Sequence, residues 1–121
     1  MNGPTNRKER LEYTRAHRKA FRMVERELLG YNTIRGLFHD MDKQILFHFF
    51  PVDKVKKWHK AHARHHIPSA KTESDFIQMV IDWECCQYTH SGETYTAREY
   101  MEKFEPGMRS KLEPIMDRLG L

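Results

Sequence analysis

Residues 72–87 read TESDFIQMVIDWECCQ, and this stretch contains a full set of helix signals. Thr72 stands where an N-cap residue belongs, and Asp75, three residues later, occupies the second position of a capping box. Apolar residues then follow at helical spacing, at Phe76, Met79, Val80 and Trp83. The spacing predicts a helix that buries one face against the rest of the chain.

Similar signals recur along the remaining chain. A first helix is predicted from Pro4-Thr5 to Gly30, because it carries an apolar stripe spaced by four, three, four and four residues: Tyr13, His17, Ala20, Val24 and Leu28. Caps and prolines predict further helices from Asn32 or Thr33 to before Pro51, from near Asp53 to before Pro68, from Thr96 onward, and from Pro106 to Gly120. With no sustained strand-like alternation, the sequence predicts an all-α fold, a compact bundle of about five or six helices in one domain over residues 1–121.

Composition narrows the class of protein. Hydrophobic residues make up 39% and charged residues 31%, a balance typical of a globular chain and not of a disordered one. No apolar run approaches the roughly 20 residues of a membrane span, so we expect no membrane association. The N-terminus lacks the apolar core of a secretory signal, and the adjacent Cys85 and Cys86 cannot form a CxxC motif. We therefore expect a cytoplasmic protein, in the host cytoplasm if a phage encodes it.

The positive charge is concentrated near the N-terminus. Residues 5–29 contain eight Lys or Arg and four Glu, an excess that equals the net charge of +4. Such a face suits an anionic partner, above all a small phosphate-containing molecule. The same pattern is also typical of a solvent-exposed helix face with mixed charges. An anion-binding face and an ordinary exposed face therefore both stay open. The oligomeric state is also open.

Residue types that commonly bind metal ions, histidine and aspartate, fall on four successive predicted helices. His17 lies in the middle of the first apolar stripe, and the pair His39-Asp40 lies in the stretch GLFHDMDKQ of residues 36–44. Asp82 stands among apolar residues, where an unpaired carboxylate costs on the order of several kcal/mol and must be paired, protonated or bound to a cation. Helical spacing places three histidines of the third helix on one face, His59, His62 and His66, with His65 one turn from His62.

These donors predict one site at the centre of the bundle. Imidazoles and carboxylates without paired thiolates argue against a closed structural zinc site. They favour one or two divalent ions that accept octahedral coordination and retain water, namely Mn, Fe, Co, Ni or Mg. Taken alone, Asp40 and Lys43 at i,i+3 also suit a simple buried ion pair.

The order His17, His39-Asp40 and Asp82 resembles the HD-domain superfamily of metal-dependent phosphohydrolases, named for its H…HD…D ligand pattern. LFHDMDK is similar to the HDxxK motif of HD-GYP members, but residues 67–69 read IPS where the GYP element would stand, which argues against cyclic di-GMP as the substrate. The ordered set is closer to a small uncharacterised phage and bacterial HD-like family with the pattern H, HDxSK, H…HH, DW. Asp42 replaces the small residue of that motif.

The resemblance implies an HD-domain-like fold with two ions, bridged by the aspartate of the HD pair. The first ion would be bound by His17, His39, Asp40 and Asp82, and the second by His62 and His66, with His59 or His65 in reserve. The implied activity is hydrolysis of a nucleotide or similar small phosphomonoester or phosphodiester, with metal-bound hydroxide as the nucleophile. Asp40 and Lys43 would act in catalysis, and the substrate would be contacted by Lys43, Arg18 and Arg22.

Two other functions stay open. Some HD-fold proteins carry two irons and act as oxygenases, and the dense histidines permit that chemistry. Alternatively, a metal-stabilised helical bundle without enzymatic activity would bind nucleic acid or a host protein; this is not favoured, because the basic residues interleave with Glu and no DNA-reading motif is evident. Asp42, Asp75 and Glu84 are candidates to accept the second ring N–H of a ligand histidine, and Trp83 and Tyr88 are candidates to stack on a base.

Overall fold

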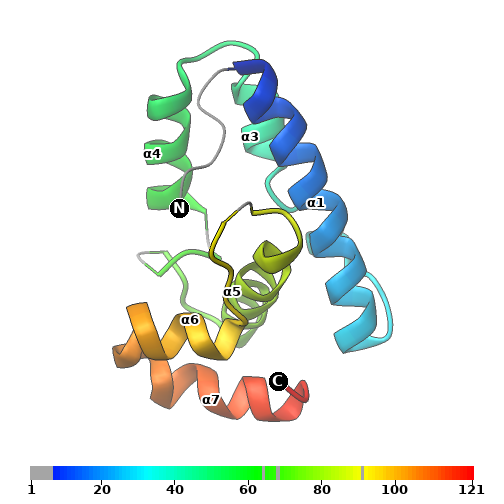
Figure 1. Ribbon diagram of the computed structural model, residues 1–121, viewed down its shortest axis with the longest axis vertical. Coiled ribbons are helices and arrows are strands. Elements are labelled where there is room, and N and C mark those ends of the chain that lie inside the picture. The colour runs from blue at the N-terminus through cyan, green and yellow to red at the C-terminus, as the bar shows by residue number, and fades with distance from the viewer. Residues whose placement is uncertain (1–6, 64, 68, 91) are drawn as a thin grey trace.

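The structure is a computed structural model that describes residues 7–63, 65–67, 69–90 and 92–121. Helices and turns account for all regular structure in these residues, which confirms the all-α prediction (Figure 1). The α-helices are α1 (Arg7–Leu29), α2 (Ile34–Leu37), α3 (Met41–Leu46), α4 (Val52–His62), α5 (Glu73–Cys85), α6 (Ala97–Phe104) and α7 (Arg109–Arg118). Short 3-10 helices, η1 (Cys86–Tyr88) and η2 (Pro106–Met108), follow α5 and precede α7.

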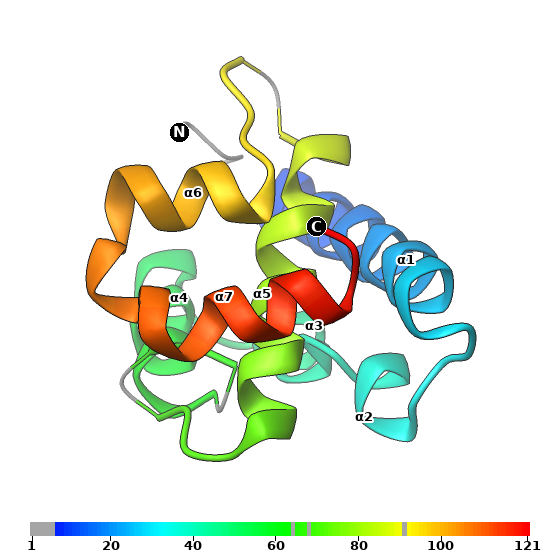
Figure 2. The same ribbon diagram turned by 90° about the horizontal axis from the view of Figure 1, so that it is seen from below.

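Helix α5 lies at the centre and is buried on two faces instead of the one face predicted. One face packs against α6 and α7 around a cluster of Met79, Val80, Ala97, Met101, Leu112, Ile115 and Met116. The other packs against α1 around Ala20, Phe21, Val24, Ile81 and Cys85. Figure 2 shows α7 crossing in front of α5, with α6 to the left of α5 and α1 to its right. Asp82 follows Ile81 on α5 and is therefore carried into the interior beside α1.

Local capping signals were predicted correctly at two helix starts. The Thr72 side chain accepts from the backbone N–H of Asp75, whose carboxylate accepts from the backbone N–H of Thr72. Thr96 and Glu99 form the same reciprocal pair at the start of α6. The predicted start of the first helix, at Pro4-Thr5, lies outside the described residues.

The second predicted helix is interrupted, which corrects the prediction of one helix up to Pro51. Helix α2 ends at Leu37, and α3 begins at Met41. Asp40 between them has φ 56°, in the left-handed region, and it is the one non-glycine residue with positive φ among those described. Asp tolerates this region better than most residues because its short polar side chain bonds locally. The break turns His39 and Asp40 inward, where both are buried.

The third predicted helix also ends early. Helix α4 stops at His62, because Ala63 takes an extended conformation with φ −71° and ψ 129°. Pro68, the predicted stop signal, lies outside the described residues. His65 and His66 therefore follow the helix in a turn, and the predicted single helical face of three histidines does not form.

A buried carboxylate holds the segment before His39 against α1. Glu25 is fully buried and accepts hydrogen bonds from the Thr33 backbone N–H at 3.0 Å, the Thr33 hydroxyl at 2.7 Å, the Asn32 amide at 3.2 Å and the Gln78 amide at 3.1 Å. Gly36 packs directly over it, since a Cβ there would lie 2.2 Å from Oε1 of Glu25. Glu25 thus connects α1, α2 and α5 beside the site.

Within the described residues, no helix combines the length and apolar character needed to cross a bilayer.

Candidate metal centre

Four buried side chains converge between α1, the α2–α3 turn and α5. His17 and His39 each place Nε2 2.8 Å from Oδ1 of Asp82, and the two Nε2 atoms lie 3.2 Å apart. Oδ2 of Asp40 lies 3.3 Å from Nε2 of His17 and 3.4 Å from Nε2 of His39. We call these four residues the first cluster. They are the four that the family resemblance implies for one ion, and one atom from each lies within 4.8 Å of the others.

A second group of donors lies against the other oxygen of Asp40. Nε2 of His59 is 2.8 Å and Nε2 of His65 is 3.2 Å from Oδ1 of Asp40, and the two nitrogens are 3.2 Å apart. His66 joins these histidines, with one atom from each of the three within 4.8 Å. We call His59, His65 and His66 the second cluster. Asp40 therefore presents one oxygen to each cluster.

The arrangement suits coordination of a cation as well as hydrogen bonding. The Nε2 atoms of His17 and His39 lie beside each other and share one oxygen of Asp82, so each can donate an N–H to that oxygen or, when neutral, bind the same ion as it does. Neighbouring ligand atoms about 2.1 Å from an octahedral ion are about 3.0 Å apart, similar to these separations. The buried Oδ1 of Asp40 has two imidazole nitrogens within 3.2 Å, and both can donate to it or bind the same cation. The donors of each cluster are thus of the kind and spacing that can hold a metal ion.

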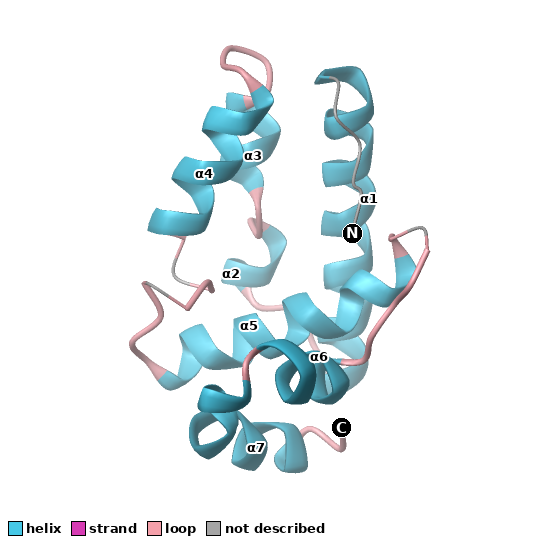
Figure 3. Ribbon diagram, turned by 60° about the vertical axis from the view of Figure 1, so that its left-hand side comes forward, coloured by secondary structure: helices cyan, strands magenta, loops and turns pink. Residues whose placement is uncertain are grey.

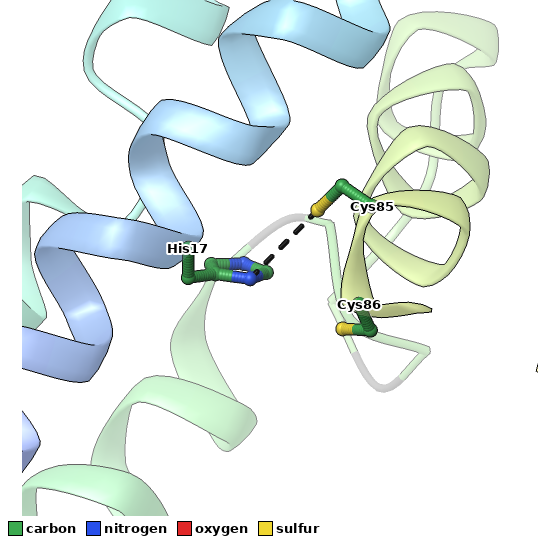
Figure 4. A group of neighbouring side chains, drawn as sticks. All are labelled: His17, Cys85 and Cys86. Carbon is green, nitrogen blue, oxygen red and sulfur yellow. Dashed lines mark hydrogen bonds between the residues drawn. The ribbon is translucent and has the colours of Figure 1, made fainter. Parts of the chain in front are cut away.

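The outer nitrogens of the histidines also have defined neighbours. Nδ1 of His59 lies 2.5 Å from Oδ2 of Asp42, so the carboxylate that departs from the HDxSK pattern orients a second-cluster histidine. Nδ1 of His17 lies 3.7 Å from Sγ of Cys85, and Figure 4 shows Cys86 next to that thiol. Burial raises the pKa of the Cys85 thiol well above its usual value, which keeps the sulfur protonated beside the imidazole.

Asp75 and Glu84, the other two carboxylates predicted to orient a ligand histidine, have partners outside the two clusters. Asp75 caps α5 and pairs with Arg35 at 2.7 Å, and Glu84 accepts from the backbone N–H of Ala97 at 2.8 Å.

Electrostatics favour charged carboxylates in the clusters. Burial raises the pKa of Asp40, but His39 and Lys43 outweigh it and hold that pKa well below its usual range. For Asp82, likewise, hydrogen bonds with His17 and His39 overcome burial and lower the pKa. Burial lowers the pKa of His66 to about 3, so this side chain is neutral, the form that coordinates metals.

The residues predicted to contact substrate take different places. Lys43 lies at the edge of the first cluster, with Nζ 3.8 Å from Oδ2 of Asp40. Arg18 instead donates from Nε to the His39 carbonyl at 2.9 Å and from Nη2 to the Leu37 carbonyl at 3.0 Å. It therefore holds the α2–α3 turn, a role that sequence reasoning missed. Arg22 and Arg18 are both half-buried. Neither of them lines the cavity that opens beside the two clusters, which Lys43 does line.

His62 does not join the second cluster, although the sequence placed it first in that ligand set. Its side chain is exposed, its ring stacks on Trp58 and its Nδ1 lies 2.8 Å from the Trp58 carbonyl. The reserve residues His59 and His65 take its place, because the early end of α4 lets the chain turn back and bring His65 against His59.

A cavity of about 350 Å³ opens beside both clusters, lined by His59 and His66 of the second cluster and Asp82 of the first. Lysines and aromatic rings make up much of the remaining lining: Lys43, Lys56, Lys57, Lys60, Trp83, Tyr95 and Tyr100. Three of the lysines were not predicted as site residues. The signal for them was their own spacing in KVKKWHK, where Lys60 follows Lys56 by four residues and Lys57 by three. Tyr88, a predicted stacking residue, does not line this cavity.

Comparison of the chain with known protein families, curated proteins and solved structures gave no match.

Proposed function

We propose that this protein is a metal-dependent phosphohydrolase that acts on a nucleotide or similar small phosphate ester. One observation carries the proposal: buried Asp40 directs its two oxygens at two separate groups of imidazoles, with a lysine-lined cavity beside them. Such a bridging carboxylate is the arrangement that a pair of divalent ions requires, and paired ions are typical of enzymes that cleave phosphate esters.

In this proposal each side chain has a defined task. The first cluster would hold one ion, and Asp40 with the second cluster would hold the other. Bound divalent ions supply a water of lowered pKa and neutralise charge on the phosphoryl oxygens. Lys43, beside Asp40, would bind a phosphate oxygen, while Asp42 keeps the ring of His59 in place. Arg18 holds the turn that carries the ligands His39 and Asp40.

The cavity favours a phosphate ester over the substrate of an iron oxygenase. An oxygenase would use the same two clusters, but it has no general need for a cationic wall. Four lysines line the cavity beside the clusters, and this positive charge suits a substrate with several negative oxygens.

The test compares two histidines of one helix. His59→Ala removes a second-cluster donor, and His62→Ala is the matched control because His62 is exposed on the same helix. Purified protein is analysed for bound metal and then assayed with Mn²⁺ against nucleotides, cyclic dinucleotides and a generic phosphodiester. We expect His59→Ala to lose bound metal and to lower hydrolysis by at least about 100-fold, because losing a direct donor should cost no less than losing a partner that orients one, which costs about 10–100-fold. His62→Ala should match the parent protein.

Two results would contradict the proposal. One is hydrolysis that Asp40→Ala leaves unchanged, which would assign the activity to a contaminant. The other is protein that contains iron and consumes oxygen but releases no phosphate, which would support the oxygenase instead.

A further inference from the structure

The cavity beside the clusters has two walls of different chemistry. Lysines from α3 and α4 form one wall, and aromatic rings from α5, the following loop and α6 form the other. Figure 3 shows α4 and α6 apart from each other, with α5 below α4. Residues of both metal clusters lie in the lining between the walls. A ligand that reaches the clusters therefore meets cations and aromatic rings at the same time.

The lysine wall carries more positive charge than one phosphate group requires. Two divalent ions together with the carboxylates Asp40 and Asp82 have a net charge that one phosphate dianion neutralises. Within the described chain, Lys56, Lys57 and Lys60 form no ion pair with a carboxylate. Burial lowers the pKa of Lys56, and the positive charges of Arg10, Lys43 and Lys60 lower it further. Lys56, Lys57 and Lys60 are exposed and solvated without a ligand, and their positive charge suits additional anionic groups on one.

The aromatic wall is already arranged in the structure. The rings of Trp83 and Tyr100 lie 4.7 Å apart at an interplanar angle of 44°. Tyr95 is held by a hydrogen bond from Lys103 to its hydroxyl at 3.2 Å and by the edge of Phe104. Preformed aromatic faces beside cations are the usual surroundings of a stacked nucleobase.

We infer that the cavity binds a nucleotide carrying at least two phosphate groups, with its base against Trp83 and Tyr100 and its outer phosphate against the lysines of α4. This rests on the proposed function and specifies its substrate class. A volume of about 350 Å³ is near the lower end of the roughly 300–1,000 Å³ of small-molecule sites. It accommodates one nucleotide and is too small for several stacked bases of a strand.

Calorimetric titration of the metal-loaded full-length protein tests the inference. The probes are adenosine and guanosine monophosphates, their diphosphates with a methylene group between the phosphates, and methylenediphosphonate without a nucleoside. We expect one of the diphosphates to bind about tenfold more tightly than its monophosphate and than methylenediphosphonate, since a charge-assisted contact changes affinity by about that factor.

Variants test which part of the nucleotide each wall contacts. The double variant Lys56→Ala/Lys57→Ala should lower the affinity for the diphosphate about tenfold and change that for the monophosphate by less than about threefold. Lys71→Ala, an exposed lysine outside the cavity, is the matched control. Tyr100→Leu should lower the affinity for both the monophosphate and the diphosphate nucleotide but leave the affinity for methylenediphosphonate unchanged. Should Tyr100→Leu fail to fold, Tyr95→Leu tests the same wall.

Equal affinity for monophosphates and diphosphates would overturn the inference, as would tighter binding of a short single-stranded oligonucleotide than of any mononucleotide. These outcomes are separable from those of the proposed function. Nucleotide binding by a metal-loaded protein that hydrolyses none of the natural nucleotides, cyclic dinucleotides or phosphodiester of the activity assay would contradict the hydrolase alone. Hydrolysis of a generic phosphodiester without preference for a nucleoside would contradict the inference alone.

Discussion

Replacing Gly36 with alanine tests how the ligand-bearing turn is held. The added Cβ would lie 2.2 Å from Oε1, 2.3 Å from Oε2 and 2.5 Å from Cδ of Glu25. Ordinary contacts need at least about 3.4 Å, so the carboxylate must move by about 1 Å or more. Glu25 cannot move freely, because it is fully buried and accepts hydrogen bonds from Asn32, Thr33 and Gln78.

The cost of this substitution follows from the hydrogen bonds of the displaced carboxylate. A hydrogen bond to a charged group contributes about 1.5–3 kcal/mol, and the displacement should break about two of them. The reduced freedom of the unfolded chain returns about 0.4–1 kcal/mol when glycine becomes alanine. We expect a net loss of about 3 kcal/mol in the free energy of unfolding. For 121 residues this corresponds to a melting temperature about 12 °C lower.

Thermal and urea unfolding, followed by circular dichroism, measure this loss. Gly107→Ala is the control, because a Cβ there meets nothing within 4 Å, and it should change stability by less than about 0.5 kcal/mol. A double-mutant cycle identifies the cause: in a Glu25→Ala background, Gly36→Ala should cost far less. The reasoning is refuted if Gly36→Ala is as stable as the parent, or if its cost is the same in both backgrounds.

Two further predictions concern metal affinity and acid stability. Asp42→Asn removes the charge that faces Nδ1 of His59 and should weaken Mn²⁺ binding by about 10–100-fold, measured by titration calorimetry; unchanged affinity would show that Asp42 does not orient this ligand. The folded-state pKa of Asp75 lies below its usual value, because the backbone N–H groups of Thr72 and Lys71 and the Arg35 side chain outweigh burial. Asp75 therefore contributes stability that is present above pH about 4 and is lost as the pH falls below it. Asp75→Asn should thus lower the melting temperature at pH 7 more than at pH 3, and an equal decrease at both would contradict this assignment.

Local signals in the sequence predicted several helix starts and pointed to two members of the first cluster. Capping pairs such as Thr72 with Asp75 act over three residues and need no distant partner, so they can be recognised in the sequence. The same holds for the apolar stripe that carries His17. An ionisable residue in a buried stripe requires a partner, and this requirement pointed to His17 and Asp82 before any contact was known.

Tertiary structure decided which histidines form the second cluster. The left-handed backbone of Asp40 breaks a stretch that local periodicity predicts to be continuous, and it directs the two oxygens of Asp40 to different histidines. The early end of α4 brings His65 to His59 and leaves His62 exposed. Helix ends and backbone breaks of this kind depend on packing between segments far apart in the sequence, which residue spacing along one helix does not encode.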